Sequence, residues 1–235
     1  MKRIQQYLYF LKNNSFSIGS YIHGEIEIVT DVQKILSIEQ EMRVRLKKNN
    51  LPEEWSEIGI VYEDQYCIII RDAVVFPTGN AGTYIRIMPK SQLNGAPGVV
   101  ILPVLDSQII LHRSYRHAIR DWEIAVPRGF GEIGEDILGT ARRELQEETG
   151  YTIANIYPLG IITPDTGLMG SIVHIYYAEV NQIKERACHE YSEAISNNLI
   201  LATPEELDKM IYKGEIIDGY TICAFSLAKI KGYLP

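Results

Sequence analysis

The chain has few cysteines, no long apolar run and no excess of basic residues. Its three cysteines, Cys67, Cys188 and Cys223, show neither the paired spacing of a zinc site nor a disulfide framework. We therefore expect reduced thiols in an intracellular, cytoplasmic protein. No apolar run approaches the length of a membrane span, and the N-terminus lacks the apolar core of a signal peptide, which predicts no membrane partner.

Basic charge is in deficit. The 235 residues include 23 Lys and Arg against 30 Asp and Glu, a formal net charge of -7. Nonspecific binding of nucleic acid needs a basic face, so we expect no nucleic-acid partner. The balance still allows a small anionic substrate held by a metal ion and a few arginines. A hydrophobic content of 46% is ordinary for a globular protein with a sizeable core.

Patterning divides the chain into an N-terminal helical extension, residues 1–55, and a larger domain, residues 56–235. Apolar residues have helical spacing within 4–11 and 31–50, and we expect a packing or homodimer element there. A glycine- and proline-containing stretch at 94–98 is the best linker candidate. Short β-rich runs separated by turn residues are predicted strands: 58–62, 66–71, 73–76, 84–87, 99–105 and 109–114.

The C-terminal part continues the mixture of strands and helices. Strand-like runs at 153–162 and 171–180 flank a loop at 163–170 that is rich in turn formers. Thr203, followed by proline, is a candidate N-cap of a helix. Asp218 is expected to cap the last helix rather than to catalyse.

A glycine-rich turn at 129–134 runs into an acidic segment that has the signals of one helix. Asp136 is a candidate N-cap and Gly150 a candidate C-terminal stop. Apolar residues at helical spacing predict its buried stripe: Ile137, Ala141, Leu145 and, at the margin, Leu138.

The acids of this helix are costly unless something offsets them. Glu144 and Glu148 share a face at i and i+4, and Glu147 lies at its edge. Two carboxylates about 6 Å apart repel by roughly 3 kcal/mol at an effective dielectric near 20, and Arg143 relieves only part of this. Two interpretations stay open: a solvated acidic face, or a site for a hard divalent cation, Mg²⁺ first and Mn²⁺ second.

The same stretch resembles the Nudix box, G-x5-E-x7-R-E-U-x-E-E-x-G-U, in which U is an aliphatic residue. Eight positions fall in register: Gly129, Glu135, Arg143, Glu144, Leu145, Glu147, Glu148 and Gly150. Tyr151 departs from the aliphatic residue that closes the pattern. The resemblance implies an α/β fold, the Nudix α/β/α sandwich with a mixed sheet, here preceded by an N-terminal α+β extension. It also implies hydrolysis of a nucleoside diphosphate linked to another moiety, with bound divalent metal.

Roles carried over by position define the expected site. By this resemblance Glu135 is the partner of Arg143 and orients the helix and loop. The implied metal ligands are Glu144, Glu148, Glu147 as a further ligand or its support, and the backbone carbonyl of Arg128.

A competing motif lies in the same stretch. Gly129, Gly131 and Gly134 spell G-x-G-x-x-G between a predicted strand and a helix, as in a dinucleotide fingerprint. Such a site would place a pyrophosphate at the helix N-terminus. Glu132 and Glu135 would then crowd that phosphate with like charge, so we do not favour this interpretation.

Residues 115–128 resemble the approach to the box in ADP-ribose pyrophosphatase-like members. There a tyrosine–arginine pair and an acidic strand precede a proline, which implies that Arg116 and Glu123 lie on the substrate side and that Arg116 contacts the pyrophosphate. A guanidinium fork suits two phosphate oxygens. The alternative is an ion pair of Arg116 with Glu123 or Asp121. Trp122 is expected in the core or in a wall rather than as a base-stacking platform.

In that subgroup a loop after the box recognises substrate and often carries a glutamate that acts as general base or metal ligand. Ser171 stands at that place here, and a serine is a poor base for water. Asp165 or a box glutamate is the substitute, although Asp165 is also typical of a turn.

The function implied by the resemblance is metal-dependent hydrolysis of the pyrophosphate bond of a nucleoside diphosphate sugar. ADP-ribose, cleaved to AMP and ribose 5-phosphate, is the leading substrate. Two alternatives stay open: another nucleoside diphosphate derivative, and an inactive Nudix domain that binds nucleotide as a sensor or partner module, which Ser171 motivates.

Overall fold

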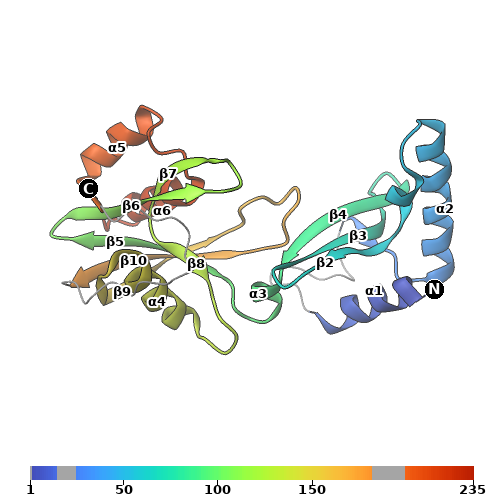
Figure 1. The fold of residues 1–235 in the computed structure, drawn as a ribbon, viewed down its shortest axis with the longest axis horizontal. Helices are drawn as coiled ribbons and strands as arrows, with labels where there is room; N and C mark the ends of the chain where they lie inside the picture. Colours follow the sequence, from blue (N-terminus) through green and yellow to red (C-terminus); the bar gives the residue numbers. More distant parts are fainter. Residues whose placement is uncertain (1, 15–24, 182–198) are drawn as a thin grey trace. The chain divides into compact units, whose positions relative to one another are not determined.

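The computed structural model describes residues 2–14, 25–181 and 199–235; Cys188 lies outside them. Two compact units make up the chain: Met1–Asn94 with Asp165–Ile172, and Gly95–Pro164 with Val173–Pro235 (Figure 1). The division after Asn94 falls in the linker candidate at 94–98. It differs from the expected boundary after residue 55, because 56–94 pack with the N-terminal helices.

The first unit is a four-stranded antiparallel sheet packed against two helices (Figure 1). The long strand β3 pairs with each of the other three strands. The strands are β1 (Glu27–Ile28), β2 (Gly59–Glu63), β3 (Cys67–Val75) and β4 (Ala81–Pro89). The two helices are α1 (Lys2–Asn13) and α2 (Val32–Lys48), and the unit also has the 3-10 turn η1 (Glu53–Ser56) and the short helix α3 (Lys90–Leu93).

A buried polar network crosses the core of this unit. Asp72 accepts a hydrogen bond from the Tyr7 hydroxyl at 2.7 Å and another from Arg86 Nε at 2.6 Å. Burial, and then the Asp72 charge, raise the pKa of Tyr7, so this hydroxyl remains a donor. We predicted two strands, 66–71 and 73–76, and this was wrong. The strand continues through Asp72 because its charge is satisfied inside the sheet.

Segment 165–172 completes the first unit. Ile87 of β4 donates its N–H to the carbonyl of Leu168 at 2.9 Å, and its own carbonyl accepts from Gly170 N at 3.0 Å. Residues 165–172, which lie between two strands of the second unit, therefore extend the edge of the first unit's sheet at β4.

The second unit is a sheet of order β11-β6-β5-β10-β9, with β7 paired to β6 and β8 paired to β5. β5 and β10 run parallel and the other pairs are antiparallel, so the sheet is mixed. Its strands are β5 (Gly98–Leu105), β6 (Gln108–Arg116), β7 (Asp121–Ala125), β8 (Arg128–Phe130), β9 (Thr152–Ile162), β10 (Val173–Asn181) and β11 (Ile200–Ala202).

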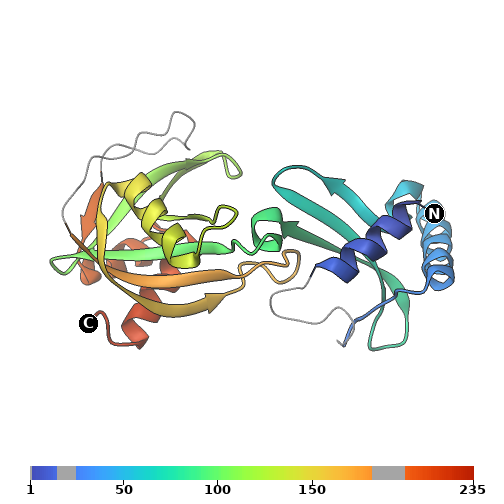
Figure 2. The same cartoon turned by 90° about the horizontal axis from the view of Figure 1, so that it is seen from below.

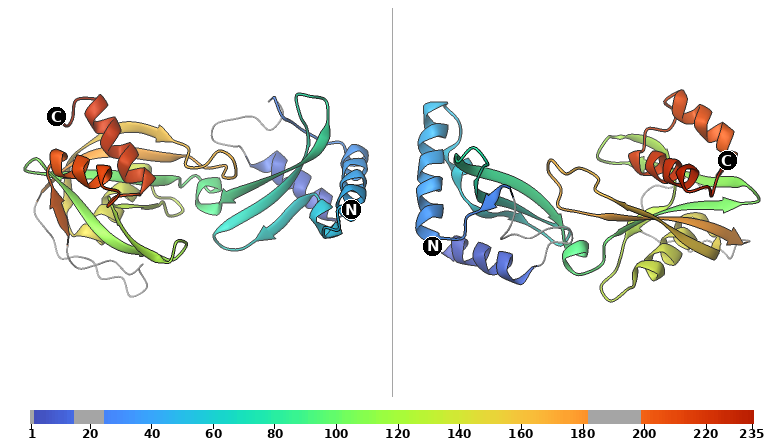
Figure 3. Two further views of the ribbon diagram at one scale, coloured as in Figure 1. Left: turned by 90° about the horizontal axis from the view of Figure 1, so that it is seen from above. Right: turned by 180° about the vertical axis from the view of Figure 1, so that it is seen from behind.

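Helices cover both faces of this sheet. Figures 2 and 3 show α4 (Ile137–Thr149) on one face and α5 (Pro204–Tyr212) and α6 (Gly219–Ile230) on the other. Val99 and Ile101 of β5 pack in the core shared with α4, whereas Val100 and Leu102 pack in the core shared with α6. Such a strand is buried on both sides, which explains its uninterrupted apolar sequence. The predicted α/β/α sandwich with a mixed sheet is confirmed.

Within the described ranges, no helix combines the length and the apolar character that crossing a membrane requires.

Candidate active site

The helix α4 begins and ends where its sequence signals lie. The Asp136 side chain caps it by accepting from Gly139 N at 2.6 Å, and Gly150 ends it with a left-handed φ of 81°. Both predictions are confirmed. Ala141 and Leu145 are fully buried, whereas Leu138 is 38% exposed and lies outside the stripe.

Among the described strands, the short β8 pairs only with β5, which leaves its other edge free. Ile101 N donates to the Pro127 carbonyl at 3.0 Å, which fixes the alternation of the antiparallel pair β5–β8. The next pair, Val100 and Arg128, is then a pair without mutual hydrogen bonds. The N–H and C=O of Arg128 therefore both point away from β5.

Side chains of α4 meet that free edge. Arg128 N donates to Glu148 Oε2 at 3.0 Å, and the Phe130 carbonyl accepts from Arg143 Nη2 at 2.9 Å. Between them, a Cβ on Gly129 would overlap the Glu144 carboxylate. The box helix thus contacts three successive residues of β8, and a side chain at the central one would displace the Glu144 carboxylate.

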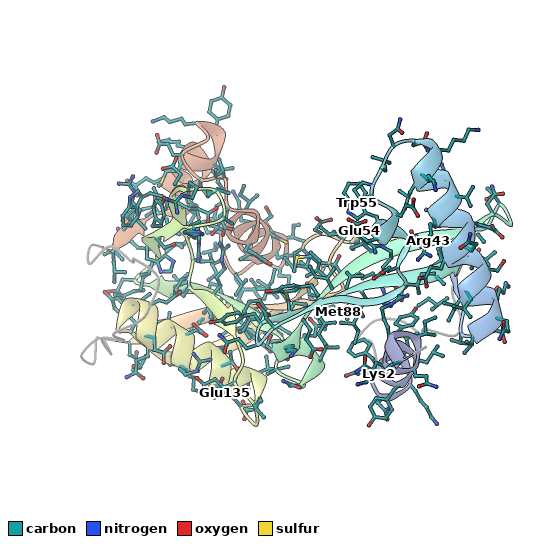
Figure 4. All side chains as sticks on the ribbon, turned by 45° about the vertical axis from the view of Figure 1, so that its right-hand side comes forward. Lys2, Arg43, Glu54, Trp55, Met88 and Glu135 are labelled. Carbon is teal, nitrogen blue, oxygen red and sulfur yellow. The ribbon has the colours of Figure 1, made fainter. Side chains whose placement is uncertain are left out.

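Arg143 gathers three box carboxylates. Its Nε and Nη2 donate to the two oxygens of Glu135 at 3.1 and 3.0 Å, and its Nη1 donates to Glu144 at 2.9 Å and to Glu147 at 3.2 Å. Glu135 lies just before α4 (Figure 4). The Arg143–Glu135 pairing implied by the resemblance is present as a two-point fork.

These contacts shift the pKa values in opposite directions. The bonds from Arg143 lower the pKa of Glu135 to about 2. Burial raises the pKa of Glu144 despite the nearby guanidinium. Burial alone would lower the pKa of Arg143, but its carboxylate partners raise it above the usual value. Counted over the described residues, one guanidinium faces three carboxylates here, and negative charge is in surplus.

The donor set fits a hard divalent cation. Carboxylate oxygens of Glu144 and Glu148 lie against the edge that carries the Arg128 carbonyl, and Glu147 shares Arg143 Nη1 with Glu144. Oxygen ligands suit Mg²⁺ or Mn²⁺. Among the described residues, no three His, Cys, Asp or Glu side chains stand close enough together to hold an ion as they are. A cation would have to compete with Arg143 Nη1 for Glu144 and Glu147.

A second arginine cluster lies beside the first. Arg116 Nε donates to Glu123 Oε2 at 3.3 Å, and Arg128 Nη2 donates to the same oxygen at 3.1 Å. Arg128 Nη1 donates to Asp218, and this partner raises the pKa of Arg128 although burial lowers it. The ion pair that we left open for Arg116 is thus present, and its contact with pyrophosphate stays a prediction.

Trp122 is not in the core. It is 41% exposed on the hairpin β6–β7, where it meets Tyr115 edge-on with ring centroids 5.8 Å apart. Of the two expected positions, core or wall, the core was wrong: Trp122 pairs across the hairpin with Tyr115 and stays partly exposed. A wall position for Trp122 stays a prediction.

Asp165 forms a turn. Its side chain accepts from Gly167 N at 3.0 Å, as we expected for the turn-forming alternative. Asp165 and the buried Ser171 belong to the first unit, whereas the box belongs to the second. A substrate contact by Asp165 stays a prediction.

Sequence reasoning missed two neighbours of the site. His112 is fully buried on β6, and its Nδ1 lies 3.5 Å from Glu148 Oε2. Its signal was a polar residue at an inward position of the predicted strand 109–114. The contact of Asp218 with Arg128 gave no local signal, because it joins residues far apart in the chain.

Comparison with known proteins agrees with this geometry. The family model described as "NUDIX domain" matches residues 95–222, more than half of the chain. The chain belongs to the Nudix family. As a Nudix protein it is a hydrolase of the pyrophosphatase kind, in the ADP-ribose pyrophosphatase-like subgroup.

Two relatives and one solved structure are similar to this Nudix protein. The ADP-ribose pyrophosphatase of Bacillus subtilis is 29% identical over 160 residues, 67% of this chain and 82% of the relative. The methanol dehydrogenase activator of Bacillus methanolicus is 28% identical over 162 residues, 68% and 83% of the two chains. A crystal structure of an ADP compounds hydrolase has a TM-score of 0.64 at 18% identity, covering 75% of this chain and 93% of that one, which shows the shared fold.

Proposed function

We propose that this Nudix protein hydrolyses the pyrophosphate bond of a nucleoside diphosphate sugar, with ADP-ribose as the substrate and AMP and ribose 5-phosphate as the products. The observation that carries the proposal is the surplus of box carboxylates that α4 brings to the free edge of β8. The name of the Bacillus subtilis relative supports ADP-ribose.

Mg²⁺, or Mn²⁺ in its place, would be held by Glu144, Glu148, Glu147 and the carbonyl of Arg128. A bound divalent ion supplies a Lewis acid for the phosphoryl oxygens and lowers the pKa of a water molecule. The residues of the chain position the metal ligands and the substrate, and they supply the proton acceptor.

Arg143 and Glu135 keep the ligands in place. Glu135 occupies Nε and Nη2 of Arg143, so the guanidinium would stay fixed if Glu144 and Glu147 left its Nη1 to hold a cation. Arg143 thereby offsets the surplus charge while no cation is bound. We propose this exchange as the reason why one arginine is surrounded by three acids.

Arg116 is the proposed contact to the pyrophosphate, oriented by Glu123 through Nε. Asp165 is a proposed substrate contact from segment 165–172. The proton acceptor is a box glutamate or Asp165, since Ser171 at its usual pKa is a poor base. A homodimeric, cytoplasmic enzyme with no nucleic-acid or membrane partner completes the proposal, and light scattering in solution tests the dimer.

The test is turnover of ADP-ribose with Mg²⁺, followed as phosphate released from the products by a phosphatase. Loss of an outer partner of a metal ligand typically costs about 10–100-fold, so Glu148→Gln is expected to lose more than ~100-fold. The matched control is Glu215→Gln, which removes an exposed glutamate that pairs only loosely with Lys213. Equal turnover of Glu148→Gln and wild type would remove Glu148 from the mechanism.

The alternative function, a nucleotide-binding sensor, is supported by Ser171, which stands where the subgroup often has a glutamate. One relative is named as an activator, so we propose a direct test of this alternative. Calorimetry with ADP-ribose in Mg²⁺ and in Mn²⁺ separates the two functions. Tight binding without any product, across a panel of nucleoside diphosphate derivatives, would favour the sensor. Product from another member of that panel would correct only the substrate.

A further inference from the structure

Residues at the N-terminus of α6 form hydrogen bonds with segment 126–128, which leads into β8. We propose that Asp218 is a positioning residue: through Thr221 and Arg128 it holds segment 126–128 so that the Arg128 backbone faces Glu148. The catalytic meaning of this role rests on the proposed function. The structural claim, that α6 fixes the ligand-bearing edge, stands on the contacts alone.

The first of these contacts binds the backbone of Val126. Val126 donates its N–H to Thr221 Oγ1 at 3.0 Å, and that hydroxyl donates to Asp218 Oδ2 at 2.6 Å. Thr221 N donates to the same carboxylate oxygen at 2.9 Å. Thr221 is fully buried and Asp218 is 4% exposed, so these bonds have little competition from water.

The second of these contacts binds the Arg128 side chain. Its Nη1 donates to Asp218 Oδ1, its Nη2 donates to Glu123, and its guanidinium lies 4.7 Å from the ring centroid of Tyr220. The two oxygens of Asp218 therefore serve different partners: one holds Val126 by way of Thr221, and the other holds Arg128.

The backbone of Arg128, in contrast to its side chain, faces the box glutamates of the candidate site. Arg128 N donates to Glu148 Oε2 at 3.0 Å, and β8 has only three residues to fix its own position. Without the charge on Asp218, the Arg128 side chain would have only Glu123 left of its two acidic partners. Glu123 also binds Arg116. The backbone that faces the box acids would then be less firmly placed.

Asp218→Asn tests the role with little change of shape. The neutral amide has one acceptor oxygen for the two tasks. We expect the amide hydrogens of Val126 and Arg128 to exchange about tenfold faster or more. We expect the affinity for Mn²⁺, measured by electron paramagnetic resonance without nucleotide, to fall about 10–100-fold. Provided that the wild-type protein turns over ADP-ribose, kcat of Asp218→Asn should fall in parallel with the Mn²⁺ affinity, while KM changes little.

Two further variants separate positioning from folding. Arg128→Gln leaves the cap of α6 intact and is expected to reproduce the loss of Mn²⁺ affinity; the double variant should cost no more than either single one. Asp31→Asn is the control, because Asp31 caps α2 in the same way, accepting from Lys34 N at 2.8 Å, without an arginine partner in that contact. It should leave exchange at Val126 and Arg128 unchanged.

The outcomes are distinguishable. Wild-type exchange at both amides in Asp218→Asn and Arg128→Gln would overturn the positioning role, whatever the activity. A wild-type protein that binds Mn²⁺ but cleaves no nucleotide would overturn the proposed function and leave the exchange result to decide the role of Asp218.

Discussion

Each unit of the molecule contains an arginine–carboxylate network, and the two differ in their charge count. In the described part of the first unit, Arg86 faces one carboxylate, Asp72, which also accepts from a tyrosine hydroxyl. In the second unit Arg143 faces three carboxylates. The first network is balanced and nearly closed to water, whereas the second carries surplus negative charge at a partly open edge.

The difference separates structural acids from functional ones. A balanced buried pair needs no further partner, and losing one member leaves the other charge uncompensated. A surplus of carboxylates repels itself in the free protein, so its members are held at a cost that a bound cation would remove. Charge count around an arginine thus predicts the sign of a stability change before any assay.

The largest expected effect is in the balanced network. Asp72→Asn leaves the Arg86 guanidinium without its carboxylate and is expected to lower the free energy of unfolding by about 3–5 kcal/mol, measured by urea denaturation. The control is Asp208→Asn, which breaks the surface pair with Lys229 and should cost less than about 1 kcal/mol. Equal effects of the two changes would contradict the comparison.

The second effect is in the surplus network and has opposite signs for activity and stability. Glu144→Gln is expected to reduce turnover more than ~100-fold, about 2.7 kcal/mol of activation free energy. Removing one of three carboxylates around Arg143 also relieves repulsion. The melting temperature without metal should therefore stay equal to that of wild type or rise, as calorimetry would show. A clear drop would mean that Glu144 is a structural acid like Asp72.

The smallest effect concerns acid titration of Glu135. Its pKa is lowered from 4.5 to about 2, so its contribution to stability is present above the unfolded value and is lost as pH falls toward 2. Glu135→Gln should flatten the loss of stability across that window. The difference should stay below about 1 kcal/mol, because solvent screens this side chain. Parallel unfolding curves for the variant and wild type from pH 4.5 downwards would show that the Arg143 fork contributes nothing.

Local signals carried the part of the site that the sequence could predict. Asp136 and Gly150 set the ends of α4 because a cap needs only its own few neighbours. The spacing of Glu144 and Glu148 fixed their shared face for the same reason. Where side chain and backbone interact within one turn of helix, the sequence alone was sufficient.

Distant partners account for what the sequence did not predict. The sequence wrongly predicted a break in the strand at Asp72, because no residue near Asp72 in the chain indicates that Tyr7 and Arg86 bind its carboxylate. Arg128 was assigned a role only through its carbonyl, since its bond to Asp218 spans most of the second unit. The boundary after residue 55 was placed by pattern, but the β-rich runs at 56–94 fit a sheet of either unit, and only packing shows which one.

The loop between β9 and β10 has a practical consequence for dissecting this protein. Because residues 165–172 belong with β4, the chain passes between the units at 94–95, at 164–165 and again at 172–173. A single scission after Asn94 would yield a C-terminal fragment that still carries a piece of its neighbour, and an N-terminal fragment with an uncovered strand. Recombinant separation of the two halves therefore calls for a shortened β9–β10 turn on one and a grafted eight-residue patch on the other.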